Sequence, residues 1–283
     1  VLLAEGRPGR FLEDLDLEAP DVALHPLVED GAEEIAPIAG PDGLAPPLSY
    51  RAGQHLTLLV NMDGTTHRRC YSFSTSPLAS GRPAITVKRV ADGAVSRYLH
   101  EHVREGSTLT ALEPTGEFTL DTDPAASRHV VLVAGGVGIT PLVSLAETVL
   151  RAEPASRVTL LTGNRCEDEI IFRARLDALA SEFRPRLAVQ HALEVAPVGW
   201  PGPRGLLDGP QVLRAIGGAA ADAWFVCGPE PMMQGVCESL ASAGVPRDRV
   251  HTERFAYASA ATTRIPDHAA ELRFAKSGRR VTA

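Results

Sequence analysis

Hydrophobic positions recur at every second residue, or nearly so, in short runs through the first part of the chain. Glycine and proline turns separate four such runs, which lie at 54–60, 84–90, 109–112 and 118–120. Many short strands punctuated in this way predict an antiparallel β barrel or sandwich. One helix, at 96–103, is expected to interrupt it.

After residue 129 the pattern changes to apolar strands that alternate with helices. Five strands are predicted at 130–133, 158–161, 187–190, 224–226 and 250–252. Apolar residues recur with helical spacing between them, first at Leu142, Leu145, Ala146 and Val149, and later at Met233, Val236, Cys237 and Leu240. Thr140 is the expected N-cap of the first helix and Pro141 its first residue. This alternation predicts a parallel sheet with helices on both faces.

The two ends of the chain differ from these central parts. Residues 1–24 are acidic and aperiodic and do not begin with Met, so we expect an extension, or the remnant of a linker, in a fragment or processed chain. Residues 256–270 resemble a linker, and 272–282 predict two strands around a Ser277-Gly278 turn. An isolated hairpin is marginally stable in water, so we expect the start of a further domain that is cut off at Ala283. The predicted divisions are 1–24, 25–124, 125–257 and 258–283.

Composition and charge exclude several classes of function. The chain of 283 residues has 44% hydrophobic and 22% charged residues, which fits a globular protein of two domains. A net charge of −7 without a basic stripe argues against nucleic-acid binding. No uncharged apolar run approaches the roughly 20 residues that span a bilayer. The first residues lack the basic region of a secretory signal, so a cytoplasmic protein is expected.

Cysteines and histidines give no pattern of a metal site. The four cysteines are widely spaced, and free thiols are expected for all of them. His100 and His102 would lie on different faces of their helix, which is poor ligand geometry. We therefore predict no metal ligands within these residues.

Three short motifs carry candidate chemistry. They are Arg69-Cys70-Tyr71-Ser72-Phe73-Ser74, Gly135-Gly136-Val137-Gly138-Ile139-Thr140-Pro141 and Cys227-Gly228-Pro229. The arginine offers a bidentate match for a phosphate. The glycine-rich motif ends a strand and opens a helix, where the backbone can approach a pyrophosphate at the positive end of the helix dipole. Taken singly, they are also compatible with a barrel strand, a plain glycine-rich turn and a small buried cysteine.

In this order the three motifs resemble the ferredoxin–NADP reductase superfamily. Its members place an antiparallel Greek-key flavin-binding barrel before a parallel-sheet nicotinamide-binding domain, and the resemblance covers about residues 25–255. It implies FAD and NAD(P)H as cofactors, with FAD favoured over FMN because the similar subfamilies use it. The stretch from Tyr50 to His55 also resembles a turn of the family, F-x-x-G-Q-Y/H.

The resemblance implies flavin contacts from the barrel. Tyr71 would stack on the ring or bind the ribityl chain, Ser72 would reach the ring N5, and Arg69 would hold a phosphate. The helix that begins after Gly93 is expected to bind the flavin pyrophosphate, although a hairpin turn and a capped helix would account for the same residues. The full set implied for the flavin is Arg69, Tyr71, Ser72, Phe73, Ser74, Val87, Lys88, Gly93, Val95, Ser96, Thr140 and Phe255.

Further residues are implied for the nicotinamide nucleotide. Arg165 could pair with a 2′-phosphate or be a solvated loop residue, while Glu167 and Asp168 could meet a free ribose or cap the next helix. The choice between NADH and NADPH therefore stays open. The implied set is Gly135, Gly136, Gly138, Thr140, Pro141, Asn164, Arg165, Cys227, Gly228 and Pro229. Ser72, Cys227 and Glu253 are the implied catalytic residues, with Cys227 beside the nicotinamide C4.

The implied activity is hydride transfer from NAD(P)H to FAD. The order of the parts resembles the reductase components of phenylacetyl-CoA epoxidase and ketosteroid hydroxylase, which implies an oxygenase or hydroxylase as partner. The last hairpin resembles the first hairpin of a plant-type ferredoxin, so a [2Fe–2S] cluster is expected only in a domain beyond Ala283. Two alternatives remain: a free flavin reductase or flavohaemoglobin-type module, and a non-catalytic nucleotide-binding electron-relay subunit.

Overall fold

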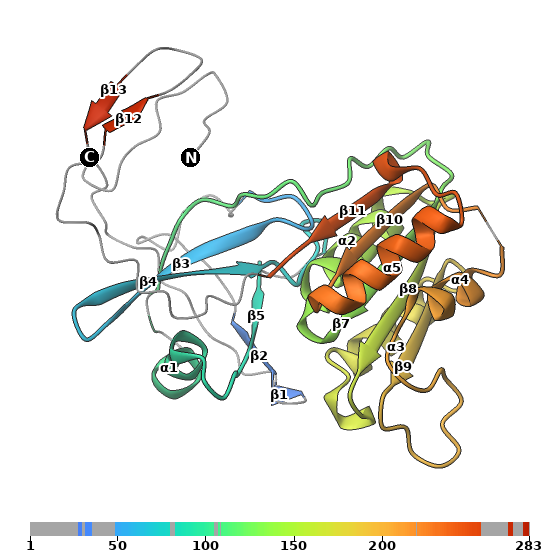
Figure 1. Ribbon diagram of the computed structural model, residues 1–283, viewed down its shortest axis with the longest axis horizontal. Coiled ribbons are helices and arrows are strands. Elements are labelled where there is room, and N and C mark those ends of the chain that lie inside the picture. The colour runs from blue at the N-terminus through green and yellow to red at the C-terminus, as the bar shows by residue number, and fades with distance from the viewer. Residues whose placement is uncertain are drawn as a thin grey trace.

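The chain folds into two units that lie side by side (Figure 1). The computed structural model describes residues 28–29, 32–35, 49–79, 83–104, 107, 109–218, 220–255, 271–273 and 280–282. An antiparallel unit comes first along the chain, and a parallel sheet covered by helices follows it. This architecture confirms the fold class predicted from the sequence.

The first unit consists of two small antiparallel sheets and one helix. One sheet has the order β1-β2-β5 and the other β4-β3-β6. Their elements are β1 (Val28–Glu29), β2 (Ala32–Ile35), β3 (His55–Met62), β4 (Thr65–Ser72), β5 (Ile85–Lys88), α1 (Ala94–His102) and β6 (Thr110–Ala111). A bridge between Phe73 and Ile85 connects the two sheets. The helix predicted at 96–103 is therefore confirmed, with its start two residues earlier.

Strands β3 and β4 form a hairpin whose turn is Asp63-Gly64. Both turn residues have positive φ, 50° and 75°, as the two-residue turns of twisted hairpins require. Within β3, Leu56, Leu58 and Val60 are buried and alternate with more exposed residues. Their side chains form the core of this unit.

The strand predicted at 118–120 is wrong. These residues form no strand, and Phe118 instead packs in the core of the second unit. The rings of Phe118 and Phe225 are nearly perpendicular there, with centroids 5.2 Å apart. Ala52 joins the same core. The two units therefore share hydrophobic packing, and burial of a large aromatic side chain outweighs the short alternating pattern.

The second unit is a five-stranded parallel sheet, as predicted. Its order is β11-β10-β7-β8-β9. The strands are β7 (His129–Gly135), β8 (Arg157–Asn164), β9 (Leu187–Leu193), β10 (Ala223–Cys227) and β11 (Val250–Glu253). The helices are α2 (Ile139–Ala152), α3 (Arg173–Glu182), α4 (Gly209–Ile216) and α5 (Glu230–Ser242), with short 3₁₀ turns η2 (Gly136–Gly138), η3 (Glu167–Glu169) and η4 (Arg247–Arg249).

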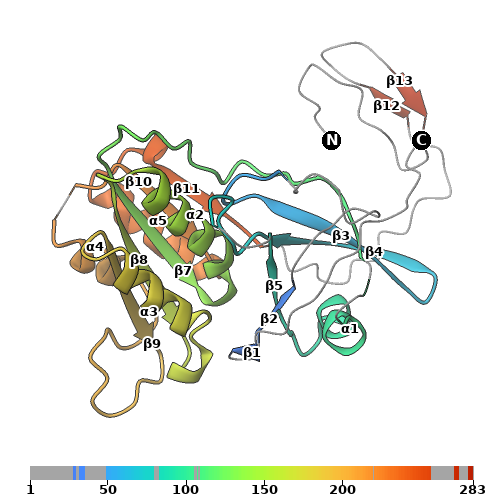
Figure 2. The same ribbon diagram turned by 180° about the vertical axis from the view of Figure 1, so that it is seen from behind.

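Helices cover both faces of this sheet, and its central strand β7 is therefore buried on both sides. Val130 and Leu132 pack with α2 and α3, whereas Val131 and Val133 pack with α4 and α5. Figure 1 shows α4 and α5 on the near face, and Figure 2 shows α2 and α3 on the other. A continuous apolar run in β7 is what burial on both faces requires.

The terminal hairpin is confirmed as far as the structure describes it. Strands β12 (Glu271–Arg273) and β13 (Arg280–Thr282) pair antiparallel, with Leu272 opposite Val281. The predicted Ser277-Gly278 turn, the linker at 256–270 and the extension at 1–24 lie outside the described residues.

Candidate functional site

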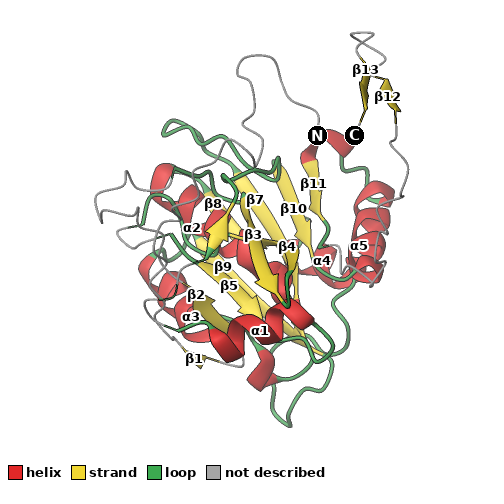
Figure 3. Cartoon of the chain, turned by 90° about the vertical axis from the view of Figure 1, so that its left-hand side faces the viewer, coloured by secondary structure: helices red, strands yellow, loops and turns green. Residues whose placement is uncertain are grey.

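The carboxyl ends of three neighbouring strands form one side of the candidate site. Cys227, at the end of β10, lies opposite Ala134 of β7 on one side and Glu253 of β11 on the other. In open parallel sheets, ligands bind in the crevice beyond the carboxyl ends of the strands. Figure 3 shows β7, β10 and β11 next to one another in the parallel sheet. The sheet therefore brings the predicted Cys227 and Glu253 together beside the glycine-rich turn.

The glycines of this turn have two different structural roles. A Cβ on Gly138 would lie 2.2 Å from the Cys227 carbonyl oxygen, and one on Gly228 would lie 2.8 Å from Gly135. These three glycines allow the turns after β7 and β10 to touch. Only Gly136 of the turn, with φ of 50°, faces open space among the described residues. The close approach of a nucleotide, expected for every glycine of the motif, is thus open at Gly136.

The predicted N-cap role of Thr140 is wrong. Helix α2 begins at Ile139 with Gly138 as its N-cap, which places Thr140 inside the first turn. Its buried hydroxyl donates to the Val137 carbonyl at 3.1 Å. The 3₁₀ turn formed by Gly136–Gly138 has advanced the helix start, a shift that sequence signals for capping do not detect.

The other side of the site comes from the antiparallel unit. Ser72, the last residue of β4, pairs with His55, the first residue of β3. The Ser72 hydroxyl is buried and has no hydrogen-bond partner among the described residues. Burial raises the pKa of the neighbouring Tyr71 to about 12, so its hydroxyl stays protonated at neutral pH. Two hydroxyl donors thus stand at the end of this hairpin.

His55 connects the antiparallel side of the site with the sheet side. The sequence alone predicted no role for it at the site. Its Nδ1 lies 3.7 Å from Glu253 Oε1. The backbone of His55 exchanges two hydrogen bonds with Thr115, at 2.9 and 3.0 Å, and Gly116 has no side chain to crowd the imidazole. The only sequence signal for His55 was its place in the F-x-x-G-Q-Y/H turn. The structure thus aligns Ser72, His55, Glu253 and Cys227 across the junction of the units.

Burial controls the protonation of the Cys227 thiol. The side chain is completely buried, and this burial, followed by the nearby negative charge of Glu253, raises the pKa of the thiol above its ordinary value. Cys227 is therefore a neutral thiol at physiological pH rather than a nucleophilic thiolate. The thiol therefore adds no charge at this edge of the sheet, where its side chain is enclosed by the core of the second unit.

The unpaired polar atoms fit a polar cofactor at the junction. Glu253 Oε2, like the Ser72 hydroxyl, is buried and has no hydrogen-bond partner among the described residues. Buried polar groups are nearly always paired in native proteins, and each one left unpaired costs roughly 1–3 kcal/mol. A flavin ring, which presents both donors and acceptors, would satisfy these atoms. The Ser72 hydroxyl and Glu253 Oε2 are thus the atoms on which the fit to FAD rests.

Other residues implied for the flavin serve the protein itself. Phe73 is fully buried and stacks on Tyr50 with ring centroids 3.9 Å apart, and Val87 and Val95 belong to the same core. The Ser74 hydroxyl donates to the Ala84 carbonyl at 3.3 Å. Any contact that these residues make with a cofactor would have to come from their backbone.

The expected anion site at α1 is partly occupied by the protein. The Ser96 hydroxyl accepts from the Val90 amide and donates to the Gly93 carbonyl, both at 3.1 Å. Arg69 donates to the Arg68 carbonyl at 2.7 Å, and Lys88 lies 3.7 Å from Glu169. Since the Ser96 hydroxyl is used within the turn, a pyrophosphate there would depend on the backbone amides at the start of α1.

The residues predicted to meet the adenosine lie at the end of β8. Asn164 is buried, and its side-chain amide donates to Thr162 Oγ1 at 3.0 Å. The Arg165 side chain is 74% exposed and lies 4.0 Å from Glu169. Arg165 is therefore accessible to a ligand, but it already has an acidic neighbour.

Three further predicted residues lie at the edges of the site. Pro141 is buried in the first turn of α2, and Pro229 is the exposed N-cap of α5. Phe255, at the end of the described sheet, packs against the core of the second unit. The structure therefore brings the implied nicotinamide residues to one sheet edge.

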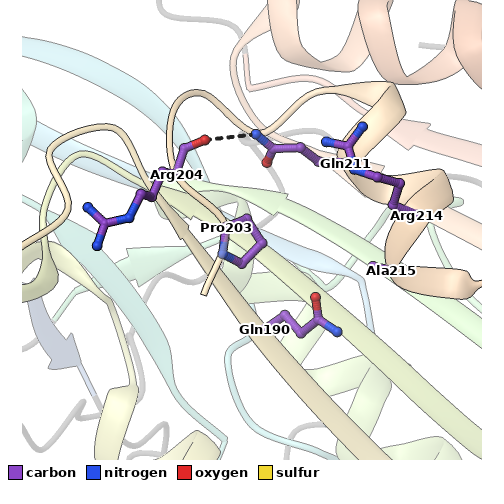
Figure 4. Close-up of a pocket in the computed structure, with 6 residues that line it drawn as sticks. All are labelled: Gln190, Pro203, Arg204, Gln211, Arg214 and Ala215. Carbon is purple, nitrogen blue, oxygen red and sulfur yellow. Dashed lines mark hydrogen bonds between the residues drawn. The ribbon is translucent and has the colours of Figure 1, made fainter. Parts of the chain in front are cut away.

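A pocket of about 410 Å³ lies elsewhere, between strand β9 and helix α4 (Figure 4). Its lining residues are Gln190, Pro203, Arg204, Gln211, Arg214 and Ala215. The Gln211 amide donates to the Arg204 carbonyl at 3.1 Å, and the Arg204 guanidinium donates to Pro197 and neighbouring carbonyls. The pocket shares no residue with the predicted site, so the candidate chemistry is not located there.

Metal-binding clusters and membrane-spanning helices are both absent from the described part of the chain. There, no group of three or more His, Cys, Asp or Glu side chains could hold a metal ion. Among the same residues, no helix is long and apolar enough to cross a membrane.

Comparison with known proteins identifies two domain families in the chain. The family model described as oxidoreductase FAD-binding domain matches residues 43–120. The model described as oxidoreductase NAD-binding domain matches residues 132–238. The chain therefore contains FAD-binding and NAD-binding oxidoreductase domains.

Curated relatives carry the same two parts. The ferredoxin reductase component of 3-ketosteroid-9-alpha-monooxygenase from Rhodococcus rhodochrous is 37% identical over 232 residues, which is 81% of this chain and 63% of that protein. A component of the 1,2-phenylacetyl-CoA epoxidase of Escherichia coli K12 is 34% identical over 222 residues, covering 77% and 62%. The chain thus spans less than two thirds of either relative.

A third relative is covered over most of its length. Ferredoxin–NADP reductase B from Sorangium cellulosum is 37% identical over 212 residues, which is 73% of this chain and 85% of that protein. Among solved structures, the flavohaem-like FAD/NAD-binding domain of nitric oxide dioxygenase from Vibrio cholerae has a TM-score of 0.71 at 26% identity. That match covers 84% of this chain and 98% of the other.

Proposed function

The chain belongs to the ferredoxin–NADP reductase family, and from this premise we propose that it is an FAD-dependent NAD(P)H oxidoreductase. The observation that carries the proposal is the junction of the two units. There Ser72 and His55 of the FAD-binding part meet Glu253 and Cys227 of the NAD-binding part. We place the boundary between the parts at residues 124 and 125.

The chain's residues would hold two aromatic rings face to face. FAD, when bound, supplies a ring that accepts a hydride and releases electrons singly. Ser72 would donate a hydrogen bond to the ring edge, and Tyr71 would hold its side chain. Orienting two reactants in this way lowers the activation barrier, because their freedom of motion is lost on binding rather than during the reaction.

Residues of the sheet edge would place the nicotinamide. The open face of Gly136 would admit a pyrophosphate at the start of α2, and the end of β10 with the neutral Cys227 thiol would lie beside the ring. Glu253 would balance charge beside the reacting ring while its carboxylate is held near His55. The positive charge of Arg165 would favour a 2′-phosphate, whereas the negative charge of Glu169 beside it would oppose one, so the choice between NADH and NADPH stays open.

We further propose that the electrons pass through a [2Fe–2S] centre to an oxygenase or hydroxylase. The names of two relatives, a reductase component of a monooxygenase and a component of an epoxidase, support this assignment. The length of those relatives beyond the matched part and the β12–β13 hairpin support a further ferredoxin-like domain. The four free cysteines support a cytoplasmic location.

Cofactor retention tests the proposed function. The protein is loaded with FAD, passed through gel filtration and denatured, and the released flavin is identified by chromatography. Stoichiometric FAD, together with NAD(P)H oxidation in the presence of ferricyanide, is the expected result.

The same assay separates the alternatives. Flavin that leaves the protein once it is reduced would identify a free flavin reductase. Nucleotide binding without retained flavin and without oxidation would instead identify a non-catalytic protein, and would overturn the proposal.

A further inference from the structure

A polar seam joins the strand that carries Ser72 to helix α2. Directly after the flavin motif, the Thr75 carbonyl accepts hydrogen bonds from Ser144 of α2 at 2.5 Å and from Tyr50 at 2.8 Å. The next residue, Ser76, bonds to Thr148 of α2 at 2.7 Å. These side chains are buried or nearly so, and the contacts span the boundary between the two units.

Arg175 of helix α3 completes this seam. One guanidinium nitrogen donates to the Ser74 carbonyl at 2.9 Å, and the other donates to Glu147 Oε2 at 3.0 Å. The Glu147 side chain is only 6% exposed and the Arg175 side chain 26%, so the ion pair is largely sheltered from water on the side of the carboxylate. A guanidinium with two fixed acceptors holds one orientation, because its donors form a rigid fork.

A second arginine on the same carboxylate provides a natural comparison. Arg151 donates to Glu147 Oε1 at 2.8 and 2.9 Å, and it also pairs with Glu182 at 3.1 Å. Its hydrogen bonds and ion pairs within the described residues go to Glu147 and Glu182, and none of them reaches the first unit. Removing either arginine therefore leaves Glu147 with one partner, but only Arg175 touches the segment that follows Ser72.

The seam connects both halves of the proposed reaction. Helix α2 starts at the glycine turn that would hold the nucleotide, and five to nine residues after its start it carries Ser144, Glu147 and Thr148. The segment that the seam holds consists of Ser74, Thr75 and Ser76, and it starts two residues after Ser72. Since a displacement of about 1 Å can cost on the order of a hundredfold in rate, this grip can set the rate without touching a cofactor.

We propose that Arg175, oriented by Glu147, is a positioning residue that fixes the Ser72 strand against the nucleotide helix. This inference rests on the proposed function. Tyr50 assists from the barrel side, because its hydroxyl donates to the Thr75 carbonyl at 2.8 Å.

The experiment compares Arg175→Gln with the matched control Arg151→Gln. In FAD-loaded protein under anaerobic conditions, Arg175→Gln should slow flavin bleaching by NAD(P)H roughly ten- to a hundredfold. The nucleotide Kd should change by less than about threefold, and Arg151→Gln should slow bleaching by less than about twofold. Equal slowing in both variants, or none in Arg175→Gln, would overturn the proposal.

A readout other than activity and a second variant keep the test decisive if Arg175→Gln folds poorly. In flavin-free protein, amide hydrogen exchange at residues 72–76 should increase in Arg175→Gln and not in Arg151→Gln. Ser144→Ala removes the bond to Thr75 without disturbing the ion pair, and it should slow bleaching in the same direction. Unchanged amide exchange at residues 72–76 in Arg175→Gln, or an unchanged bleaching rate in Ser144→Ala, would contradict the proposed positioning role. Wild-type protein that does not bleach at all would instead overturn the proposed function.

Discussion

At the scale of single residues, the site is defined by polar atoms that the protein itself leaves unpaired. Ser72 Oγ and Glu253 Oε2 are buried at the junction of the units without partners among the described residues. In contrast, hydroxyls just outside the junction, such as those of Ser96 and Thr140, are already bonded within the chain. This contrast separates residues able to serve a cofactor from residues that build the turns around it.

Cys227→Ala tests the residue that we propose lies beside the nicotinamide. We expect flavin reduction to slow by on the order of tenfold or more, while the nucleotide Kd changes by less than about threefold, because the thiol acts on ring placement. Stopped-flow absorbance gives the rate and titration gives the Kd. Cys237→Ala, on the half-buried side of α5, is the control and should behave as wild type. Flavin reduction at an unchanged rate in Cys227→Ala would remove this residue from the site.

At the scale of elements, each turn at the sheet edge is built by glycines with separate tasks. Gly138 and Gly228 let two turns pack together, whereas Gly136 leaves room in front of α2. The sequence motif does not distinguish these tasks, because it records spacing and not the neighbours across the sheet. The Asp63-Gly64 hairpin, by contrast, has a local signal that predicts its turn without tertiary information.

Alanine substitutions separate the two tasks. Gly138→Ala should lower the free energy of unfolding by roughly 2 kcal/mol or more, since the new methyl would overlap the Cys227 carbonyl. Gly136→Ala meets no described atom within 4 Å and should cost only about 1 kcal/mol for its positive φ. It should instead raise the nucleotide Kd. Urea unfolding and nucleotide titration measure the two effects, and equal stability losses with unchanged Kd would contradict this assignment.

Three histidines of the parallel sheet, one buried and two half-buried, make it sensitive to acid. Burial lowers the pKa of His129, His191 and His251 below the ordinary value of about 6.5. Their neutral forms are favoured in the folded protein, so the stability they contribute is full above pH 6.5 and is lost as the pH falls through the folded values. The thermal midpoint should therefore be lower at pH 5.5 than at pH 7.5.

His251→Phe tests one contribution to this acid sensitivity. The imidazole stacks on Phe225 with ring centroids 4.5 Å apart, and phenylalanine preserves the stacking without a titrating group. The difference between the midpoints at the two pH values should shrink in the variant. A difference as large as in wild type would show that His251 does not contribute.

At the scale of the whole molecule, sequence patterns predicted each unit but not how the two meet. The five parallel strands and the buried positions of α2 follow from runs and spacings that burial on one or two faces imposes. The strand predicted at 118–120 failed because Phe118 packs across the boundary into the other unit. The contact of His55 with Glu253 and the grip of Arg175 on Ser74 join residues about 200 and 100 positions apart, respectively, and no local period encodes them.

The central claim is that this chain moves a hydride between two rings held at the junction. The most direct measurement is anaerobic stopped-flow absorbance of FAD-loaded protein mixed with NADH or NADPH, each with protium or deuterium in turn at the transferred C4 position. We predict that the bound flavin bleaches and that deuterium slows the bleaching several-fold, with the faster nucleotide identifying the natural donor. A retained flavin that neither nucleotide bleaches, or a protein that does not bind FAD, would contradict the account.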